Sequence, residues 1–248
     1  MALDDTDSVM DVKDVKALVF DTWGTVVDWR TSILDELHLL KAAKNATFDS
    51  EQFLRDWNAA YNPGKTKVNA GEWPWTTVSV IYRRALEDLL LKYGVRGMTA
   101  AETDHLNRAW TRTRPWPDSQ RGLAQLKEHY ILSTLSNGDF AWLVDIAKFA
   151  GLPFDCVITA ENARRYKPDP AVYRTAIELL GLRPHEVMMV AAHNYDLRGA
   201  RKLGMRTAFI PRPNEFGSQQ TSDLSAEDDW DVIAHDMLDL AAKIRRKL

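Results

Sequence analysis

The sequence has very little cysteine: Cys156 is the only one among 248 residues. A disulfide within the chain is therefore excluded, and the low count fits the reducing cytoplasm, which is the location we expect. The chain also lacks any apolar run of the roughly 20 residues that a membrane-spanning helix needs, so we expect no membrane partner.

An excess of basic residues is absent as well. Lys and Arg number 32 against 35 Asp and Glu, which gives a net charge of −3. Binding to nucleic acid requires clustered Lys and Arg that neutralise phosphates, so we expect no nucleic-acid partner. The remaining composition, 45% hydrophobic and 27% charged, is typical of a globular protein. Residues 1–14 hold five Asp and no apolar stretch, which predicts a disordered tail and not a signal peptide.

Short apolar runs alternate with helical patterns over much of the chain. Continuous, β-branched runs predict buried strands at residues 15–20, 130–135, 156–159, 187–191 and 206–210. Apolar residues at helical spacing predict helices at residues 120–128, 140–150, 170–180, 195–203 and 232–247. This alternation predicts an α/β fold, with a Rossmann-like parallel sheet as its core and helices on both sides.

The pattern changes between residues 29 and 117, where we find helical signals and no strand. Helices are expected at residues 51–61, 77–92 and 103–112, and Pro63 and Gly64 are interpreted as loop residues. We therefore predict a helical cap domain at residues 29–117, inserted after the first strand of a core made of residues 15–28 and 118–248. Seven of the nine Trp lie between Trp23 and Trp116. They either line an apolar lid over a site or form the small core of the cap.

Polar residues follow several predicted strands directly. Asp21 follows the first strand, Ser136 and Asn137 follow the second, and Lys167 and Asp196 lie in later loops. In a parallel sheet these loops meet at the carboxyl edge, where ligands bind. Each residue alone is as well explained by an ordinary turn or cap, but together they would form a cluster of two carboxylates, a hydroxyl and an ammonium.

The order of these motifs, Asp21 to Thr25 (DTWGT), LSNG, KPDP and AHNYD, resembles the haloacid dehalogenase superfamily. The resemblance extends from residue 15 to the C-terminus and is strongest for the type II 2-haloacid dehalogenase branch. It implies that Asp21 is the nucleophile and that Thr25 hydrogen-bonds the loop of the nucleophile. By the same resemblance, Lys167 keeps Asp21 ionised and helps to hold the substrate carboxylate, while Ser136 and Asn137 donate hydrogen bonds to the substrate carboxylate or to Asp21.

Trp23 distinguishes this sequence from the phosphatases of that superfamily. Those enzymes have Asp at this position, and it protonates the leaving oxygen. An indole cannot transfer that proton, whereas a halide leaves as a stable anion and needs no acid. We therefore expect a dehalogenase without metal or cofactor, and Trp23 as part of an apolar wall for the substrate. A magnesium-dependent phosphatase of the same superfamily is the alternative, and a non-catalytic binding protein is a third hypothesis.

Three further positions follow from the resemblance. Asp196 matches the carboxylate that orients the hydrolytic water and Lys167. His193 occupies a position where the family pattern has Asn, and a neutral imidazole can accept a proton from water. We predict that His193 and Asp196 together activate the water, with a buried structural histidine as the alternative. Tyr173 either contacts the site or is an aromatic residue of a helix core.

The halide site is where the sequence departs from the family. The family pattern resembles Trp-Arg-x-x-Tyr, and its Arg contacts the departing halide. Here the pattern reads Trp57, Asn58 and then Tyr61, so the Arg is missing. Arg55 lies three residues before Asn58, on roughly the same helical face. We expect Arg55 or Asn58 to take the halide-binding role beside Trp57, with a solvated surface Arg55 as the alternative.

Together these residues predict hydrolysis of the carbon–halogen bond in short 2-haloalkanoates. The resemblance implies two steps, an ester on Asp21 and its hydrolysis to the 2-hydroxy acid. A small aromatic pocket would suit haloacetate, and fluoroacetate is conceivable if several donors converge on the fluorine. The partner is a small-molecule substrate, and because the family often forms homodimers, a homodimer is a further expectation.

Overall fold

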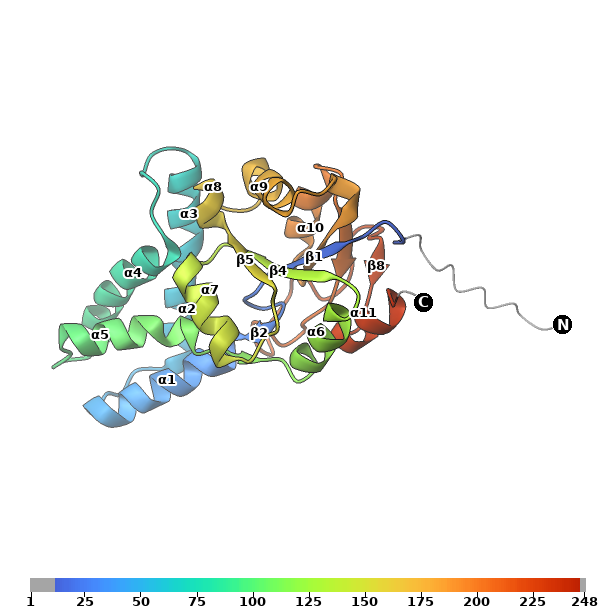
Figure 1. The fold of residues 1–248 in the computed structure, drawn as a ribbon. Helices are drawn as coiled ribbons and strands as arrows, with labels where there is room; N and C mark the ends of the chain where they lie inside the picture. Colours follow the sequence, from blue (N-terminus) through green and yellow to red (C-terminus); the bar gives the residue numbers. More distant parts are fainter. Residues whose placement is uncertain (1–11, 246–248) are drawn as a thin grey trace.

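A six-stranded parallel sheet forms the centre of the protein, seen in a computed structural model that describes residues 12–245 (Figure 1). The strand order is β5-β4-β1-β6-β7-β8. Every neighbouring pair in this sheet is parallel. The strands are β1 (Ala17–Phe20), β4 (Ile131–Ser136), β5 (Cys156–Thr159), β6 (Val187–Ala191), β7 (Arg206–Phe209) and β8 (Val232–Ile233). The predicted fold class is confirmed.

Helices cover both faces of this sheet. On one side lie α6 (Ser119–Lys127), α7 (Phe140–Phe149) and α11 (Met237–Lys243); on the other lie α9 (Pro170–Leu180) and α10 (Asn194–Arg201). Side chains of β1 alternate between the faces. Leu18 and Phe20 belong to the buried cluster that contains α6, α7 and α11, whereas Val19 packs with α9 and α10. Two short elements, α8 (Ala160–Ala163) and the 3-10 helix Pro184–Glu186, complete the connections.

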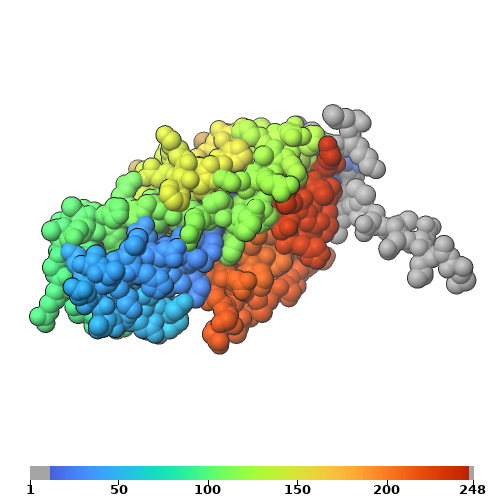
Figure 2. All heavy atoms as spheres, turned by 90° about the horizontal axis from the view of Figure 1, so that it is seen from below, coloured from blue at the N-terminus to red at the C-terminus, as the bar shows by residue number. Residues whose placement is uncertain are grey.

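The cap is a separate layer of helices beside the carboxyl edge of the sheet. It consists of α1 (Trp29–Lys44), α2 (Ser50–Ala59), α3 (Tyr61–Asn69), α4 (Val78–Lys92), α5 (Ala100–Asn107) and the 3-10 helix Arg108–Thr111. Figure 2 shows it as the blue to green end of the molecule, opposite the red C-terminal helix. Its own buried cluster includes Phe53, Trp57 and Leu86. The rings of Tyr82 and Trp110 stack in this cluster, with centroids 4.3 Å apart.

Two expectations about the cap were wrong. The chain enters and leaves the cap through an antiparallel pair, β2 (Val27–Asp28) with β3 (Arg114–Pro115), where no strand was expected after residue 29. Pro63 and Gly64 do not form a loop but lie inside α3. Pro63 is in the first turn, where its missing N–H leaves no hydrogen bond unmade. Gly64 lies so close to Ile81 that a Cβ would be 2.8 Å from that side chain.

The two ends of the chain also differ from expectation. Residues 232–247 were expected to form one helix, but Val232 and Ile233 add β8 to the sheet and α11 begins only at Met237. Most of the predicted disordered tail, residues 1–11, lies outside the described residues. Val12 does not fit that prediction, because it packs against the core cluster. No helix between residues 12 and 245 is long and apolar enough to cross a membrane.

A buried ion pair connects three parts of the core: the segment after β7, the start of α6 and the start of α11. Arg212, after β7, donates two hydrogen bonds of 2.8 and 2.7 Å to the carboxylate of Asp118, which precedes α6. Asp118 also accepts a hydrogen bond from the backbone N–H of Met237, the first residue of α11. Burial raises the pKa of Asp118, but the Arg212 hydrogen bonds and charge outweigh it, so the pKa lies below its usual value.

Removal of one partner from this pair should destabilise the protein strongly. Because Arg212→Ala leaves the Asp118 carboxylate buried without its counter-ion, we expect the free energy of unfolding to fall by about 3 kcal/mol. Urea unfolding at neutral pH measures it. The control is Arg114→Ala, which removes an exposed ion pair with Asp35 and should cost less than about 1 kcal/mol. Equal losses in the two variants would contradict the role of the buried pair.

Candidate active site

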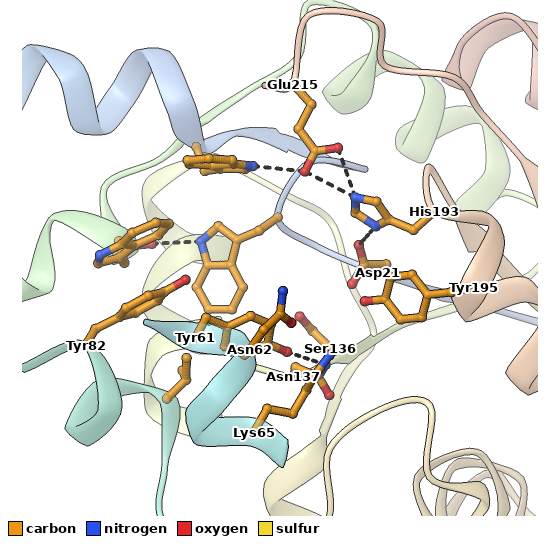
Figure 3. Close-up of a pocket in the computed structure, with 14 residues that line it drawn as sticks. Asp21, Tyr61, Asn62, Lys65, Tyr82, Ser136, Asn137, His193, Tyr195 and Glu215 are labelled. Carbon is orange, nitrogen blue, oxygen red and sulfur yellow. Dashed lines mark hydrogen bonds and ion pairs between the residues drawn. The ribbon is translucent and has the colours of Figure 1, made fainter. Parts of the chain in front are cut away.

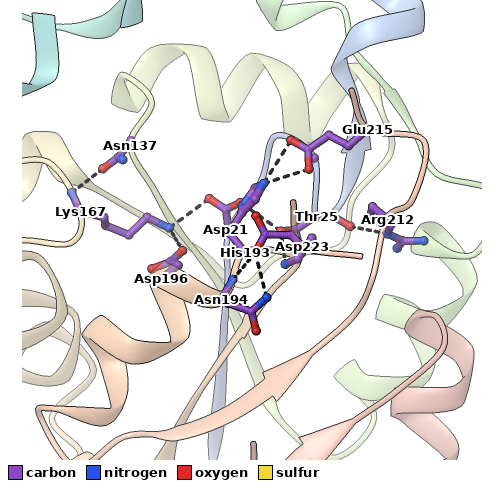
Figure 4. Close-up of polar contacts among 12 residues, drawn as sticks. Asp21, Thr25, Asn137, Lys167, His193, Asn194, Asp196, Arg212, Glu215 and Asp223 are labelled. Atoms are coloured by element: carbon purple, nitrogen blue, oxygen red, sulfur yellow. Dashed lines mark hydrogen bonds and ion pairs between the residues drawn. The ribbon is translucent and has the colours of Figure 1, made fainter. Parts of the chain in front are cut away.

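Asp21 lies at the carboxyl end of β1 and is the centre of a polar cluster (Figure 4). Its backbone N–H continues the sheet pairing by donating to the Val190 carbonyl. One carboxylate oxygen, Oδ1, accepts a hydrogen bond of 3.0 Å from Lys167 Nζ. The other, Oδ2, accepts one of 3.0 Å from Thr25 Oγ1 and lies 3.1 Å from His193 Nδ1. The sheet therefore presents a buried carboxylate with donors on both oxygens.

Lys167 is completely buried and reaches Asp21 from the loop that follows α8. Its ammonium also forms an ion pair with Asp196, at the start of α10. Asn137 Oδ1 accepts a hydrogen bond of 2.7 Å from the Lys167 backbone N–H, and Tyr173 donates one of 2.7 Å to Asp196. Tyr173 thus contacts the polar cluster through Asp196 while its ring packs in the core, which combines both alternatives for this residue.

The shared ammonium affects the two carboxylates differently. Burial alone would raise the pKa of Asp21, but the charge of Lys167 and the hydrogen bond with His193 lower it well below the usual range. The pKa of Asp196 is raised, because its burial outweighs the attraction of Lys167 and the charge of Asp21 adds to the rise. Burial would lower the pKa of Lys167, but Asp196 and Asp21 raise it. Asp21 is therefore an ionised carboxylate at neutral pH.

His193 is paired with a residue that the sequence reasoning missed. Its Nε2 lies 2.9 Å from Oε2 of Glu215, whereas Asp196, with which it is predicted to activate the water, contacts Lys167 and Tyr173. Trp29 Nε1 donates to the same Glu215 carboxylate at 3.0 Å. Burial would lower the pKa of His193, but Glu215 and Asp21 raise it well above its ordinary value. In the resting protein His193 is therefore an imidazolium between two carboxylates.

Glu215 lies in a polar segment after β7 that shows no periodicity. One local signal marks its position: Gly24 has a φ of +84°, and a Cβ there would lie 2.1 Å from Glu215 Oε1. The tight turn after Asp21 therefore leaves the space that the Glu215 carboxylate fills. A second glycine has a similar function, because a Cβ on Gly138 would lie 2.5 Å from the Trp23 ring.

A pocket of about 170 Å³ opens above Asp21 (Figure 3). The core contributes the catalytic candidates and the cap contributes an aromatic wall with one cation, Lys65. Ser136 Oγ is buried here, and no residue in the described part of the chain hydrogen-bonds it. Trp23 is fixed in the wall, because its Nε1 donates to the Trp110 carbonyl at 3.1 Å. The lining residues are Asp21, Trp23, Trp29, Tyr61, Asn62, Lys65, Val78, Tyr82, Trp110, Ser136, Asn137, His193, Tyr195 and Glu215.

The residues expected to bind halide do not line this pocket. Arg55 is exposed on α2 and donates to its helix neighbour Gln52, which is the alternative stated for it. Trp57 faces the cap core and donates to the Tyr82 carbonyl at 3.0 Å. Asn58 accepts a hydrogen bond from the Tyr82 hydroxyl. The helix phase explains the error: Phe53 and Trp57 share the buried face, and Arg55, two residues from each, points away from it.

Among residues 12–245, no group of three or more His, Cys, Asp or Glu side chains is placed to hold a metal ion. The Asp21 and Asp196 carboxylates both contact the Lys167 ammonium. A cation already occupies the space between these two carboxylates.

The α/β fold, with its buried carboxylates and ammonium at the carboxyl edge of the sheet, is that of a class of hydrolases. A family model of haloacid dehalogenase-like hydrolases matches residues 15–204, and the chain belongs to this family. Among individual relatives, (S)-2-haloacid dehalogenase 4A of Burkholderia cepacia is 28% identical over 236 residues, which cover 90% of this chain and 96% of the relative.

Two solved structures are more similar in sequence. The crystal structure of an L-2-haloacid dehalogenase is 43% identical with a TM-score of 0.90, and the alignment covers 93% of this chain and 98% of that one. A defluorinating L-2-haloacid dehalogenase is 42% identical with a TM-score of 0.91, covering 94% of this chain and 96% of that one. The resemblance found in the sequence motifs is confirmed.

The contact between His193 and Glu215 predicts a measurable pKa change. Glu215→Gln removes one of the two negative charges beside the imidazolium, so the pKa of His193 should fall. An NMR titration of histidine side chains, assigned with a His193→Gln variant, measures it. Glu227→Gln is the control, because Glu227 is an exposed carboxylate paired with Arg198, and it should leave His193 unchanged. The same His193 titration in all three forms would contradict the pairing.

Proposed function

We propose that this protein is a hydrolytic dehalogenase that releases halide from short 2-haloalkanoates through an ester on Asp21. One observation carries the proposal: an ionised, buried carboxylate faces a small aromatic pocket in which Trp23 stands where the phosphatases of the superfamily have their acidic Asp. The similarity to L-2-haloacid dehalogenases supports the same reaction class. We propose the cytoplasm as its location, in keeping with the single cysteine.

In the first step, an Asp21 oxygen attacks the carbon that bears the halogen. The new C–O bond forms as the C–X bond breaks, and the halide leaves with the bonding electron pair. Lys167 and Thr25 fix the orientation of the carboxylate, and burial removes water that would weaken its nucleophilicity. At a chiral carbon this displacement inverts the configuration.

In the second step, water attacks the carbonyl carbon of the Asp21 ester. Ester formation removes the negative charge of Asp21, and with it one of the two charges that keep His193 protonated. His193 then releases a proton and can accept one from the attacking water, while Glu215 holds its Nε2 side. The imidazolium so formed protonates the alkoxide as the acyl C–O bond breaks. The Asp21 carboxylic acid that is left then gives its proton to His193, which restores the carboxylate and the imidazolium. Each turnover therefore releases one halide and one proton, and Asp21 is regenerated.

The volume of the pocket limits the substrate. A cavity of about 170 Å³ has room for a few heavy atoms, because one water molecule occupies roughly 30 Å³ in the liquid. Haloacetates and 2-halopropionates are molecules of this size. We include fluoroacetate among the proposed substrates, since a relative 42% identical is a defluorinating enzyme.

A magnesium-dependent phosphatase remains the alternative, and Trp23 argues against it. The indole N–H donates to the Trp110 carbonyl, so the side chain is held in the wall and offers no acid to a leaving oxygen. In addition, the Asp196 carboxylate already accepts from Tyr173 and pairs with Lys167.

Halide release in the presence of EDTA tests the proposed function. We expect release from chloroacetate, fluoroacetate and one enantiomer of 2-chloropropionate, and the loss of all three activities in Asp21→Asn. Asp155→Asn, which alters an exposed carboxylate paired with Lys127, is the control and should be fully active. No halide release, together with magnesium-dependent phosphate release from phosphomonoesters, would favour the alternative.

The role of His193 predicts a trapped intermediate. In His193→Ala, ester formation should continue while its hydrolysis slows, so one halide per active site appears in a burst. Mass spectrometry of the peptide that contains Asp21 should then show the added mass of the substrate's carboxyalkyl group. In the unchanged protein, one turnover in H₂¹⁸O should label Asp21 and not the product. A variant that forms the ester slowly and accumulates none would show that His193 acts in the first step instead.

A further inference from the structure

The charges around the pocket leave one cation without a partner. Asp21 and Asp196 share Lys167, and Glu215 faces His193. Lys65, on the cap helix α3, also lines the pocket. Among residues 12–245, no carboxylate lies within ion-pair distance of its ammonium. Lys65 Nζ lies instead over two aromatic rings, those of Tyr61 and Tyr195, whose centroids are 5.1 and 5.5 Å away.

The position of Lys65 is fixed by the packing of α3. Tyr61 lies one turn earlier on the same helix, and its hydroxyl accepts a hydrogen bond from Asn137 of the core. Gly64 allows α3 to lie directly against Ile81 of α4. Burial lowers the pKa of Lys65, and the Lys167 charge lowers it further, which outweighs the opposite effect of the Asp196 charge. A half-buried ammonium beside a second ammonium is costly, and an anion in the pocket would relieve both effects.

A second polar group in the same pocket also lacks a partner. Ser136 Oγ is buried and makes no hydrogen bond within the described part of the chain. Buried hydroxyl groups are nearly always hydrogen-bonded, so an unpartnered one at a pocket wall indicates a ligand atom. Figure 3 shows Lys65, Ser136 and Asn137 on the same side of the pocket. The aromatic wall contains Trp23, Trp29 and Trp110.

We propose that Lys65 binds the carboxylate of the substrate, beside the Ser136 hydroxyl that the resemblance already assigns to it. This inference rests on the proposed function, and it divides the pocket into two parts. The carboxylate contacts the ammonium and the hydroxyl, the halogen lies toward the aromatic wall, and the reacting carbon faces Asp21. The substrate carboxylate keeps its full charge throughout the reaction, so the ammonium is matched to the permanent anion. The carbon–halogen end of the substrate is apolar and suits the aromatic wall of the pocket.

Steady-state kinetics of Lys65→Met tests this assignment. Methionine keeps the length of the side chain and removes the charge, so KM should rise on the order of 10- to 100-fold, the usual effect of losing a hydrogen bond to a charged group. Because the interaction is the same in the ground and transition states, kcat should change little. The rise in KM should be the same for chloroacetate and bromoacetate. Lys65→Arg should restore most of the binding.

Inhibition by single anions distinguishes the two anionic parts of the substrate. If Lys65 binds the carboxylate, Lys65→Met weakens inhibition by acetate and leaves inhibition by bromide unchanged. An unchanged KM overturns the proposal. So does a loss of kcat that is largest for fluoroacetate, accompanied by weaker bromide inhibition, since that pattern assigns Lys65 to the halide. Lys67→Met is the matched control, because Lys67 is an exposed lysine on the same helix, above the ring of Trp73.

Calorimetric binding of acetate to the full-length protein separates this inference from the proposed function. Acetate carries no halogen and undergoes no reaction, so its binding reports only on the anion site. Weaker acetate binding in Lys65→Met, with unchanged binding in Lys67→Met, supports the site even if no halide is released from any substrate. Equal acetate affinity in both variants and the unchanged protein overturns it.

Discussion

A single buried ammonium, that of Lys167, holds the site together. It has no exposed surface, and a charge in such a place is tolerated only when counter-ions and hydrogen bonds replace the lost water. Asp21 and Asp196 supply the two counter-ions, and each comes from the end of a different strand. The adjacency of β1 and β6 in the sheet is therefore a requirement of the charge cluster as well as of the hydrophobic core.

One ammonium cannot stabilise two carboxylates equally. Asp21 has additional donors in Thr25 and His193, and its pKa is lowered; Asp196 has the Tyr173 hydroxyl, and its pKa is raised. Of the two carboxylates, the one that faces the pocket is thus the one whose ionised form is favoured more strongly. The second pair, His193 with Glu215, lies on the other side of Asp21. Because the two side chains are in contact, a change in the charge of Asp21 changes the pKa of His193. This contact couples the two steps of the proposed reaction.

The sequence predicted the parts of the site that depend on topology. Asp21, Lys167 and Asp196 could be placed together because residues after parallel strands meet at one edge. Glu215 and Lys65 could not. Glu215 lies in an aperiodic segment, and its contacts with His193, Trp29 and the turn at Gly24 all join residues far apart in the sequence. Lys65 follows a Pro-Gly pair that resembles a loop. The motif comparison also directed attention to Arg55, although helix phase places that residue in solvent.

The contacts between the cap and the core beside the pocket also position the ammonium of Lys167. Tyr166 directly precedes Lys167, and both its backbone N–H and its carbonyl are hydrogen-bonded by Asn69 at the end of α3. The Tyr166 hydroxyl also donates to the carbonyl of Thr76 in the cap at 2.7 Å. A movement of α3 away from the core would break these contacts one residue from Lys167. The cap therefore contributes to the charge state of Asp21 without touching it, because it fixes the segment from which the ammonium extends.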